Sequence, residues 1–353
     1  MRPDYSFWEA ETYHERWDVC IIGSGITGLS TGISLLEKNP ELKVLVADRW
    51  FIPLGASTRN AGFSCFGSPS EILDDIEHMG EKAAVDLVIR RWQGLKKLRS
   101  RLDLSYAQYQ TSGGYELYQE EQFTGIMERL PYLNELLADG LQQKEVFKVK
   151  DVPAGIRGFS RSIYNDLEGQ LHPGYMMENL KRIYLDMGGR MLTGLMVESI
   201  EDQDEGLQLL NRTAVPIEAK KVVITTNAFA RQLVPELEVH GARNHVMVTS
   251  PLPDLAWKGC YHFDKGFYYF RNIGRRILLG GARNKDLERE NTEQFGFNPI
   301  IAEELERFLF THLADRSACS IDYRWSGIIG IGGQKSPIIK ALSPKLFVGV
   351  RLS

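Results

Sequence analysis

The stretch Asp18-Val-Cys-Ile-Ile-Gly-Ser-Gly-Ile-Thr-Gly28 decides the fold of this 353-residue chain. An apolar run leads into three glycines spaced as Gly-x-Gly-x-x-Gly, and apolar residues then recur at helical intervals (Ile26, Leu29, Ile33, Leu36). A second apolar run, 43–48, ends in an acid about 20 residues after the last glycine. This order predicts a strand, a glycine turn, a helix and a second strand, which together bind the ADP half of a dinucleotide.

Each residue type in this stretch has a physical reason. Gly23 permits the tight turn, Gly25 removes a side chain where a pyrophosphate must approach the backbone, and Gly28 lets the helix pack close to the sheet. The helix N-terminus offers N–H groups and the positive end of its dipole to the phosphates. Asp48 stands where a carboxylate accepts hydrogen bonds from ribose hydroxyls. This acid disfavours a 2′-phosphate, and therefore NADP, although Arg49 is adjacent.

The residues after the acid favour FAD over NAD. The chain does not continue into another strand and helix, but enters Gly55-Ala-Ser-Thr-Arg-Asn-Ala-Gly62 and then a long, mostly helical region. With these segments, the sequence resembles the D-amino-acid-oxidase-type family of FAD-dependent oxidoreductases, which includes glycine, sarcosine and γ-glutamylputrescine oxidases. Shorter matches follow in the same order along the chain: 194–197, 222–228, 268–271, 276–281, 325–327 and 335–337.

The resemblance implies an α/β fold (α+β overall), in which a Rossmann-like FAD-binding domain is interleaved with an antiparallel-sheet substrate domain. We expect the FAD-binding domain to comprise residues 1–105, 151–235 and 331–353. The substrate domain is expected to comprise residues 106–150 and 236–330. Within this fold we expect strands at 115–118, 190–200, 220–226 and 345–350, and helices within 71–102, 123–141 and 168–185.

The resemblance also implies a set of cofactor-binding residues. FAD is expected to be noncovalent, because the cysteine that tethers flavin in sarcosine oxidases is missing here. The expected FAD-binding residues are Gly23, Ser24, Gly25, Ile26, Thr27, Gly28, Asp48, Arg49, Ala56, Ser57, Thr58, Arg59, Asn60, Ala61, Gly62, Val197, Thr226 and Asn227.

Two departures from the family pattern bear on the substrate. Ile329 stands at about the place of the arginine that clamps a substrate carboxylate, and Leu278 at that of the lysine that helps oxygen react. We therefore expect a small amine or N-substituted amino compound, oxidised by hydride transfer to flavin N5, with oxygen as a slow acceptor. Arg271 or Arg283 is an alternative carboxylate clamp.

The candidate substrate residues are Tyr269, Arg271, Trp325 and Lys335. The alternatives are core packing for the two aromatics and a solvated or structural role for the arginine. His245 is expected to be structural. Two rival functions remain open. One is an FAD-dependent 2-hydroxyacid or polyol dehydrogenase, and the other is a flavin-binding protein without turnover.

Composition is that of an ordinary globular protein. The net charge of −4 gives no reason to expect nucleic acid as a partner, and no apolar run reaches the roughly 18 residues of a membrane span. The basic stretch 90–101 is expected to be a solvated helix face rather than a nucleic-acid or membrane surface. Four scattered cysteines favour a reducing cytoplasm. The histidines lack metal-ligand spacing.

The end of the chain also differs from the family. The family continues past a final strand into a glycine turn and a helix that faces the flavin, whereas this sequence stops at Ser353. We expect either an incomplete chain or a flavin site that lacks this part, and weak FAD binding in the second case. The sequence leaves the identity of the substrate, the electron acceptor and the oligomeric state open.

Overall fold

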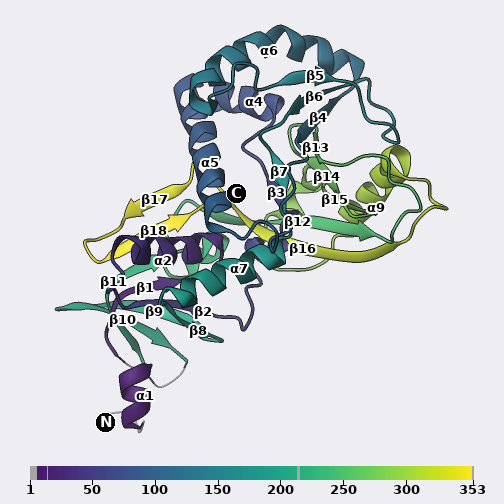
Figure 1. Cartoon of the computed structure of the whole chain (residues 1–353). Coiled ribbons are helices and arrows are strands. Elements are labelled where there is room, and N and C mark those ends of the chain that lie inside the picture. Colours follow the sequence, from purple (N-terminus) through teal and green to yellow (C-terminus); the bar gives the residue numbers. More distant parts are fainter. Residues whose placement is uncertain (1–5, 14, 213–214, 352–353) are drawn as a thin grey trace. The chain divides into compact units, whose positions relative to one another are not determined.

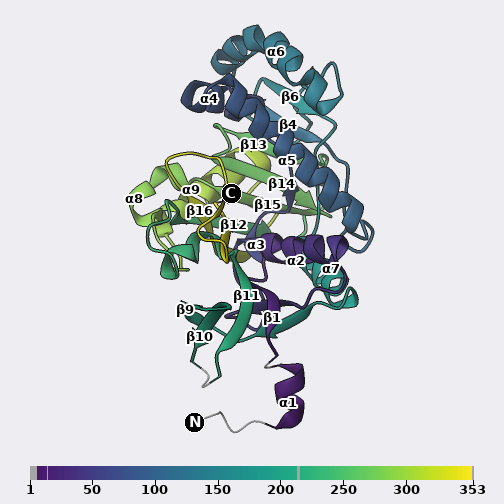
Figure 2. The same cartoon turned by 90° about the vertical axis from the view of Figure 1, so that its left-hand side faces the viewer.

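The computed structural model describes residues 6–13, 15–212 and 215–351. The chain forms two compact units (Figures 1 and 2). Unit 1 comprises Met1–Arg59, Met176–Ala242 and Ile328–Ser353, and unit 2 comprises Asn60–Tyr175 and Arg243–Gly327. The chain therefore passes back and forth between the units, in agreement with the interleaved fold that the sequence predicts.

Unit 1 is built on an eight-stranded sheet with strand order β17-β18-β11-β1-β2-β8, extended by β10 and β9. Strands β18, β11, β1, β2 and β8 run parallel, while β17, β10 and β9 are antiparallel to their neighbours. The elements wholly or mainly in unit 1 are α1 (Phe7–Thr12), β1 (Trp17–Ile22), α2 (Ile26–Lys38), β2 (Val44–Asp48), α3 (Ala56–Arg59), α7 (Pro173–Asp186), β8 (Arg190–Thr193), β9 (Val197–Gln203), β10 (Gly206–Asn211), β11 (Ile217–Ile224), η1 (Asn227–Gln232), β17 (Ile338–Ala341) and β18 (Leu346–Val350).

Strands β1 and β2 are apolar and buried over residues 19–22 and 44–47, as is typical of parallel strands covered on both faces. Helices α2 and α7 lie side by side against one face (Figure 1). Tyr184 of α7 packs against Gly32 of α2, and its single hydroxyl proton is shared between the carbonyls of Val44 at 2.7 Å and Arg190 at 3.1 Å. The tyrosine thereby joins both helices to the ends of β2 and β8.

Unit 2 contains a second eight-stranded sheet with strand order β16-β12-β15-β14-β13-β4-β6-β5. The pairs β12–β15, β15–β14, β14–β13, β4–β6 and β6–β5 are antiparallel, whereas β13 and β4 are parallel. The elements wholly or mainly in unit 2 are β3 (Phe63–Ser64), α4 (Pro69–Met79), α5 (Glu81–Arg101), β4 (Gly114–Tyr118), α6 (Glu120–Leu141), β5 (Lys148–Lys150), β6 (Arg161–Asn165), β7 (Gly169–Gln170), β12 (His240–Thr249), β13 (Cys260–Phe263), β14 (Tyr268–Ile273), β15 (Arg276–Gly281), η2 (Arg283–Lys285), α8 (Leu287–Glu290), α9 (Pro299–Phe308), η3 (Leu309–Leu313) and β16 (Ile321–Ile331).

The two faces of this sheet differ in what covers them. Alternate residues of a strand point to opposite faces, and Tyr268 and Phe270 of β14 pack against α9, where the rings of Tyr268 and Phe308 stack at 4.7 Å. Tyr269 and Ile273 belong to a separate cluster on the opposite face. Helices α4, α5 and α6 form a third cluster with Phe66 and Phe147.

Several predicted boundaries require correction. Residues 60–105 and 151–175, assigned to the FAD-binding domain from the sequence, belong to compact unit 2. The reason is that α4 and α5 pack with α6, Phe147 and Ile163. The spacing of apolar residues within one helix does not show which other elements the helix packs against. The predicted strand 190–200 is two strands, β8 and β9, separated at Gly194, whose φ of +76° interrupts the extended backbone.

Candidate functional site

The glycine turn has the geometry that the fingerprint predicts. Gly23 has a φ of +107°, in the region that favours glycine, and its N–H donates to the carbonyl of Ala47 at 2.8 Å. A Cβ atom at Gly28 would lie 1.8 Å from the carbonyl oxygen of Gly23. The helix α2 therefore approaches the turn so closely that a methyl group has no room.

Thr225 anchors this turn from the next strand. Its Oγ1 hydroxyl lies 2.8 Å from the carbonyl oxygen of Ile22 and 3.0 Å from that of Gly23. A Cβ atom at Gly23 would also lie 3.1 Å from the Thr225 oxygens. The sequence prediction named Thr226 and missed Thr225, because a hydroxyl at the end of an apolar strand carries little signal until the partner strand is known.

The start of α2 presents unpaired donors. Within the described part of the chain, the N–H groups of Thr27 and Gly28 have no hydrogen-bond partner, whereas the N–H of Ile26 donates to Ser57 Oγ at 2.9 Å. Gly25 has an ordinary φ of −70°, but a Cβ there would lie 2.8 Å from Ser57 Oγ. The turn thus leaves bare backbone and free N–H groups, which is a cradle for phosphate oxygens.

Asp48 lies beside this cradle and is buried. Its Oδ2 accepts hydrogen bonds of 2.7 Å from both the N–H and the hydroxyl of Ser24, and its Oδ1 accepts one of 3.0 Å from the N–H of Trp50. A carboxylate has about four lone-pair sites, so these three bonds orient the group and leave acceptor capacity for a ribose hydroxyl.

Arg49 is held in a stack beside Asp48. Its guanidinium lies 4.0 Å from the ring centroid of Trp50 and 4.1 Å from that of Phe229, and it donates to Gln232 at 3.2 Å. Val197, buried at the start of β9, packs in the core of unit 1. The contacts of Arg49 and Val197 with a cofactor remain predictions.

Residues after β11 converge with those after β18. Asn227 adopts a left-handed conformation (φ +47°), and its Oδ1 accepts a hydrogen bond of 2.8 Å from the N–H of Arg351. The buried Arg351 guanidinium donates to the carbonyls of Ser336 and Glu238. Thr226 Oγ1 is buried and has no partner among the described residues. This orphan hydroxyl lies at the carboxyl ends of the parallel strands, where dinucleotides bind in such sheets.

The loop 55–62 crosses from unit 1 into unit 2. Ser57 and Thr58 lie in α3, where the Thr58 hydroxyl donates to the carbonyl of Pro53. Asn60 Oδ1 accepts from the N–H of Gly62 at 2.8 Å. Gly62 has a φ of +78°, and a Cβ there would lie 2.3 Å from the carbonyl oxygen of Leu171. The contacts of Ala56, Arg59, Asn60 and Ala61 with a cofactor also remain predictions.

Arg271 holds the unit 2 end of this loop. It is buried, and its guanidinium donates to the carbonyls of Ala61 at 2.5 Å and Leu171 at 3.0 Å. Burial lowers the pKa of Arg271. It also lowers the pKa of the adjacent His172, with a further contribution from the Arg271 charge. Arg271 is therefore a structural clamp as it stands, and substrate contact by this residue remains a prediction.

Tyr269 and Trp325 lie on one apolar surface of unit 2, which we call the aromatic face. Burial raises the pKa of Tyr269, so the phenol stays neutral at physiological pH. Leu278, at the place of the family lysine, is buried on the same face. The residues of the aromatic face are Ala61, Phe63, Val246, Val248, Tyr269, Ile273, Leu278 and Trp325.

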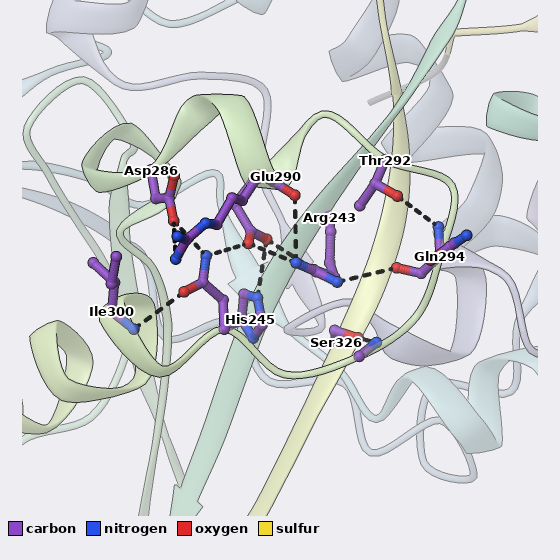
Figure 3. Close-up of polar contacts among 11 residues, drawn as sticks. Arg243, His245, Asp286, Glu290, Thr292, Gln294, Ile300 and Ser326 are labelled. Atoms are coloured by element: carbon purple, nitrogen blue, oxygen red, sulfur yellow. Dashed lines mark hydrogen bonds and ion pairs between the residues drawn. The ribbon is translucent and has the colours of Figure 1, made fainter.

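His245 lies in a different, fully paired network (Figure 3). The buried Glu290 carboxylate accepts from His245 Nε2 at 2.9 Å, Arg243 Nη2 at 2.9 Å and Asn298 Nδ2 at 2.7 Å. Burial raises the pKa of Glu290, but the hydrogen bonds from Arg243 and Asn298 outweigh it, and the net pKa is lowered. The structure therefore agrees with the structural interpretation of His245.

The remaining sequence candidates lie elsewhere. Lys335 is exposed in the segment between β16 and β17, and it belongs to unit 1, as does Ile329. In the basic stretch, Arg91 donates to the carbonyl of Phe66, and Arg99 donates to that of Leu167 while its guanidinium lies over Trp92. Arg91 and Arg99 are therefore part of the packing of unit 2. The sequence prediction had treated the whole stretch 90–101 as a solvated helix face and did not include these contacts.

None of the helices in residues 6–13, 15–212 and 215–351 combines the length and the apolar character of a bilayer span. Across the same residues, no three His, Cys, Asp or Glu side chains are grouped so that they could hold a metal ion. All four cysteines are free thiols.

The glycine turn, the unpaired N–H groups of α2, the oriented Asp48 carboxylate and the orphan Thr226 hydroxyl together fit the ADP part of a dinucleotide. The fold around them is a parallel nucleotide-binding sheet joined to an antiparallel sheet, which defines a two-domain flavoprotein oxidoreductase. Residues 18–353 match the DAO family, described as FAD dependent oxidoreductase, and the chain belongs to this family. It is accordingly an FAD-dependent oxidoreductase.

Known proteins resemble the chain over most of its length. It is 27% identical to the γ-glutamylputrescine oxidoreductase of Escherichia coli K12 over 334 residues, which cover 88% of this chain and 73% of that protein. Its fold is similar to that of glycine oxidase from Geobacillus kaustophilus, with a TM-score of 0.73, 18% identity and coverage of 95% and 89%. It also resembles FAD-bound L-α-glycerophosphate oxidase from Mycoplasma pneumoniae, with a TM-score of 0.76, 14% identity and coverage of 96% and 90%.

Proposed function

We propose that the protein oxidises a carbon–nitrogen bond of a small amine or N-substituted amino compound. The observation that carries this proposal is the aromatic face, where Tyr269, Leu278 and Trp325 present apolar and neutral groups. Ile329 replaces the clamping arginine, and Arg271 is occupied by two backbone carbonyls. An apolar surface of this kind favours an uncharged amine over a free α-amino acid zwitterion, whose charges are costly to bury.

Bound FAD supplies the two-electron acceptor of the reaction. The substrate C–H bond breaks with its electron pair, the nitrogen lone pair forms a C=N bond, and the nitrogen proton passes to water. Hydrolysis of the imine then gives a carbonyl compound and an amine or ammonia. The lone pair must be free for this step, so the reacting species is the neutral amine.

The chain's own contribution is to hold the substrate carbon and to exclude water. In this proposal Tyr269 and Trp325 contact the apolar part of the substrate, and Arg271 fixes the Ala61 carbonyl behind them. Lys335, which lies in an exposed segment, is the fourth residue that the proposal places in contact with the substrate. The proposal includes noncovalent FAD and a cytoplasmic enzyme, the latter supported by the four free thiols.

The similarity to γ-glutamylputrescine oxidoreductase supports an amine substrate, because that relative's name specifies an amine derivative. The glycerophosphate oxidase shares the fold at 14% identity. The test must therefore distinguish oxidation of a C–N bond from oxidation of a C–O bond.

Anaerobic reduction of the enzyme-bound flavin tests the proposal. The purified holoprotein is mixed in a stopped-flow instrument with butylamine, N-methylglycine, glycine, lactate or glycerol, and the visible flavin absorbance is followed. We expect butylamine, which has no carboxylate, to bleach the flavin fastest, at a rate that rises with pH as the amine loses its proton. Bleaching by lactate or glycerol alone would replace the proposal with C–O oxidation.

A further inference from the structure

His262 lies at the centre of the row of side chains that continues the aromatic face across the sheet. It pairs in register with Tyr269 on one side and with Glu116 on the other. Its ring meets that of Phe63 edge-on, with centroids 5.1 Å apart, and Phe63 meets Tyr269 in the same way at 5.8 Å. Phe63 and Tyr269 are both members of the aromatic face.

The imidazole of His262 is buried but incompletely bonded. The residue is only 8% exposed, and its Nε2 atom is buried without a hydrogen-bond partner in the described part of the chain. Buried polar atoms almost always have a partner, because an unpaired one loses its hydration without compensation. An orphan Nε2 beside apolar rings therefore requires an explanation other than folding.

The neighbouring titratable groups are engaged elsewhere. Glu116 accepts hydrogen bonds from the N–H and hydroxyl of Ser70 and from the hydroxyl of Tyr118. Glu71 of α4 accepts from the N–H and hydroxyl of Ser68. Burial lowers the pKa of His262, partly opposed by the charge of Glu71, so the imidazole is neutral at physiological pH.

His245 in the same sheet provides an internal contrast. Its Nε2 is bonded to the Glu290 carboxylate, which is what a structural histidine requires. His262 has the same burial without that partner. The difference points to a partner from outside the chain.

We propose that Nε2 of His262 accepts a hydrogen bond from the N–H of the amine substrate, and that His262 is a substrate-binding residue of this enzyme. This inference rests on the proposed function. A neutral imidazole that accepts an N–H leaves the nitrogen lone pair free to form the C=N bond. The chemical class that fits is an amine with at least one N–H and apolar carbons next to the nitrogen, since the rings of Phe63 and Tyr269 flank the imidazole.

Two substitutions separate binding from folding. His262→Phe keeps a flat ring against Phe63 and removes the ring nitrogens, whereas His262→Gln places an amide near the position of Nε2. His78→Phe, on the exposed end of α4, is the matched control for the loss of a histidine. The thermal unfolding of each protein is measured first, followed by anaerobic flavin reduction with the faster of butylamine and N-methylglycine over a range of concentrations.

The inference predicts opposite effects on stability and on binding. His262→Phe should unfold at an equal or higher temperature than the wild type, because it removes a buried unpaired polar atom. It should bind the amine about tenfold more weakly, the effect of one lost hydrogen bond to a buried group, while His262→Gln and His78→Phe stay near the wild type.

Three results would overturn the inference. The first is unchanged amine binding in His262→Phe, and the second is equal loss of binding in the Phe and Gln variants. The third is a fall in the unfolding temperature of His262→Phe, which would show a structural histidine. The proposed function fails in a different way, through absence of flavin reduction by either amine in the wild type.

Discussion

Replacement of Gly28 by alanine tests the packing of the glycine turn. The new Cβ would lie 1.8 Å from the carbonyl oxygen of Gly23, whereas contacts of Cβ atoms closer than 3.0 Å are essentially never seen. The clash is with backbone, so no side-chain rotation relieves it, and α2 must move away from β1 by more than an ångström. Such overpacking costs up to about 3 kcal/mol. Alanine regains about 1 kcal/mol of helix propensity, which leaves a net loss of about 2 kcal/mol.

Gly94 in α5 provides the matched control. A Cβ at Gly94 meets no atom within 4 Å, and the residue is exposed in the middle of a helix. Gly94→Ala should therefore stabilise the protein by about 0.5–1 kcal/mol. The assay is urea unfolding of the two apoproteins, with FAD affinity measured by fluorescence titration. We expect Gly28→Ala to lose both stability and FAD affinity, and a Gly28→Ala protein with the stability and FAD content of Gly94→Ala would refute the close approach of helix and turn.

Four further predictions concern the cofactor, two buried carboxylates and the reoxidation of the flavin. Gly25→Ala should fold normally, because the φ of −70° suits alanine and the Ser57 side chain that the new Cβ meets is flexible. The purified variant should nevertheless lack flavin, and a yellow variant would contradict pyrophosphate binding at this turn. Burial raises the pKa of Glu116 to about 7. Its contribution to stability is therefore complete below the unfolded pKa of about 4.5 and is lost as the pH rises to about 7, a change of about 3 kcal/mol. Glu116→Gln should flatten this part of the curve of unfolding free energy against pH, and an unchanged slope would show that another group is responsible. Glu290 and His245 both have lowered pKa values, because hydrogen bonds from Arg243 and Asn298 outweigh burial at Glu290 and because burial lowers the pKa of His245. Their contributions to stability are therefore lost on acidification, that of His245 from about pH 6.5 and that of Glu290 from about pH 4.5 downward. Glu290→Ala should cost about 3–5 kcal/mol at pH 7, because it leaves the partly buried Arg243 guanidinium without its ion-pair partner; the measurement is urea unfolding beside the exposed control Glu288→Ala. Reduced enzyme should react slowly with oxygen and faster with an artificial acceptor, because Leu278 replaces the family lysine, and rapid reoxidation in air would contradict that interpretation.

The cofactor half of the molecule could be predicted largely from the sequence. The glycines of the turn and Asp48 are fixed by local geometry, so their spacing of about 20 residues specifies both the fold and the ligand. The family resemblance supplied the interleaving of the domains. Thr225 and Arg351 escaped notice because their partners, Gly23 and Asn227, are more than a hundred residues away in the chain.

The substrate half was less predictable for a physical reason. Tyr269 and Trp325 lie on the aromatic face, but a side-chain pattern alone does not show what covers a face of an antiparallel sheet. The sequence left Arg271 open between a ligand and a solvated or structural arginine, and in the structure two backbone carbonyls hold its guanidinium. His262 gave no signal at all, because the absence of a bonding partner becomes visible only when every neighbour is in place.

A single-turnover experiment tests the central claim most directly. Holoprotein is mixed anaerobically with an excess of butylamine or N-methylglycine, and the loss of flavin absorbance is compared with the amount of carbonyl compound formed. The account predicts one carbonyl product for each flavin reduced. Butylamine should release ammonia, and N-methylglycine should release glycine or methylamine according to which of its carbons is oxidised. Flavin reduction without a carbonyl product, or reduction by lactate or glycerol while both amines leave the flavin oxidised, would contradict it.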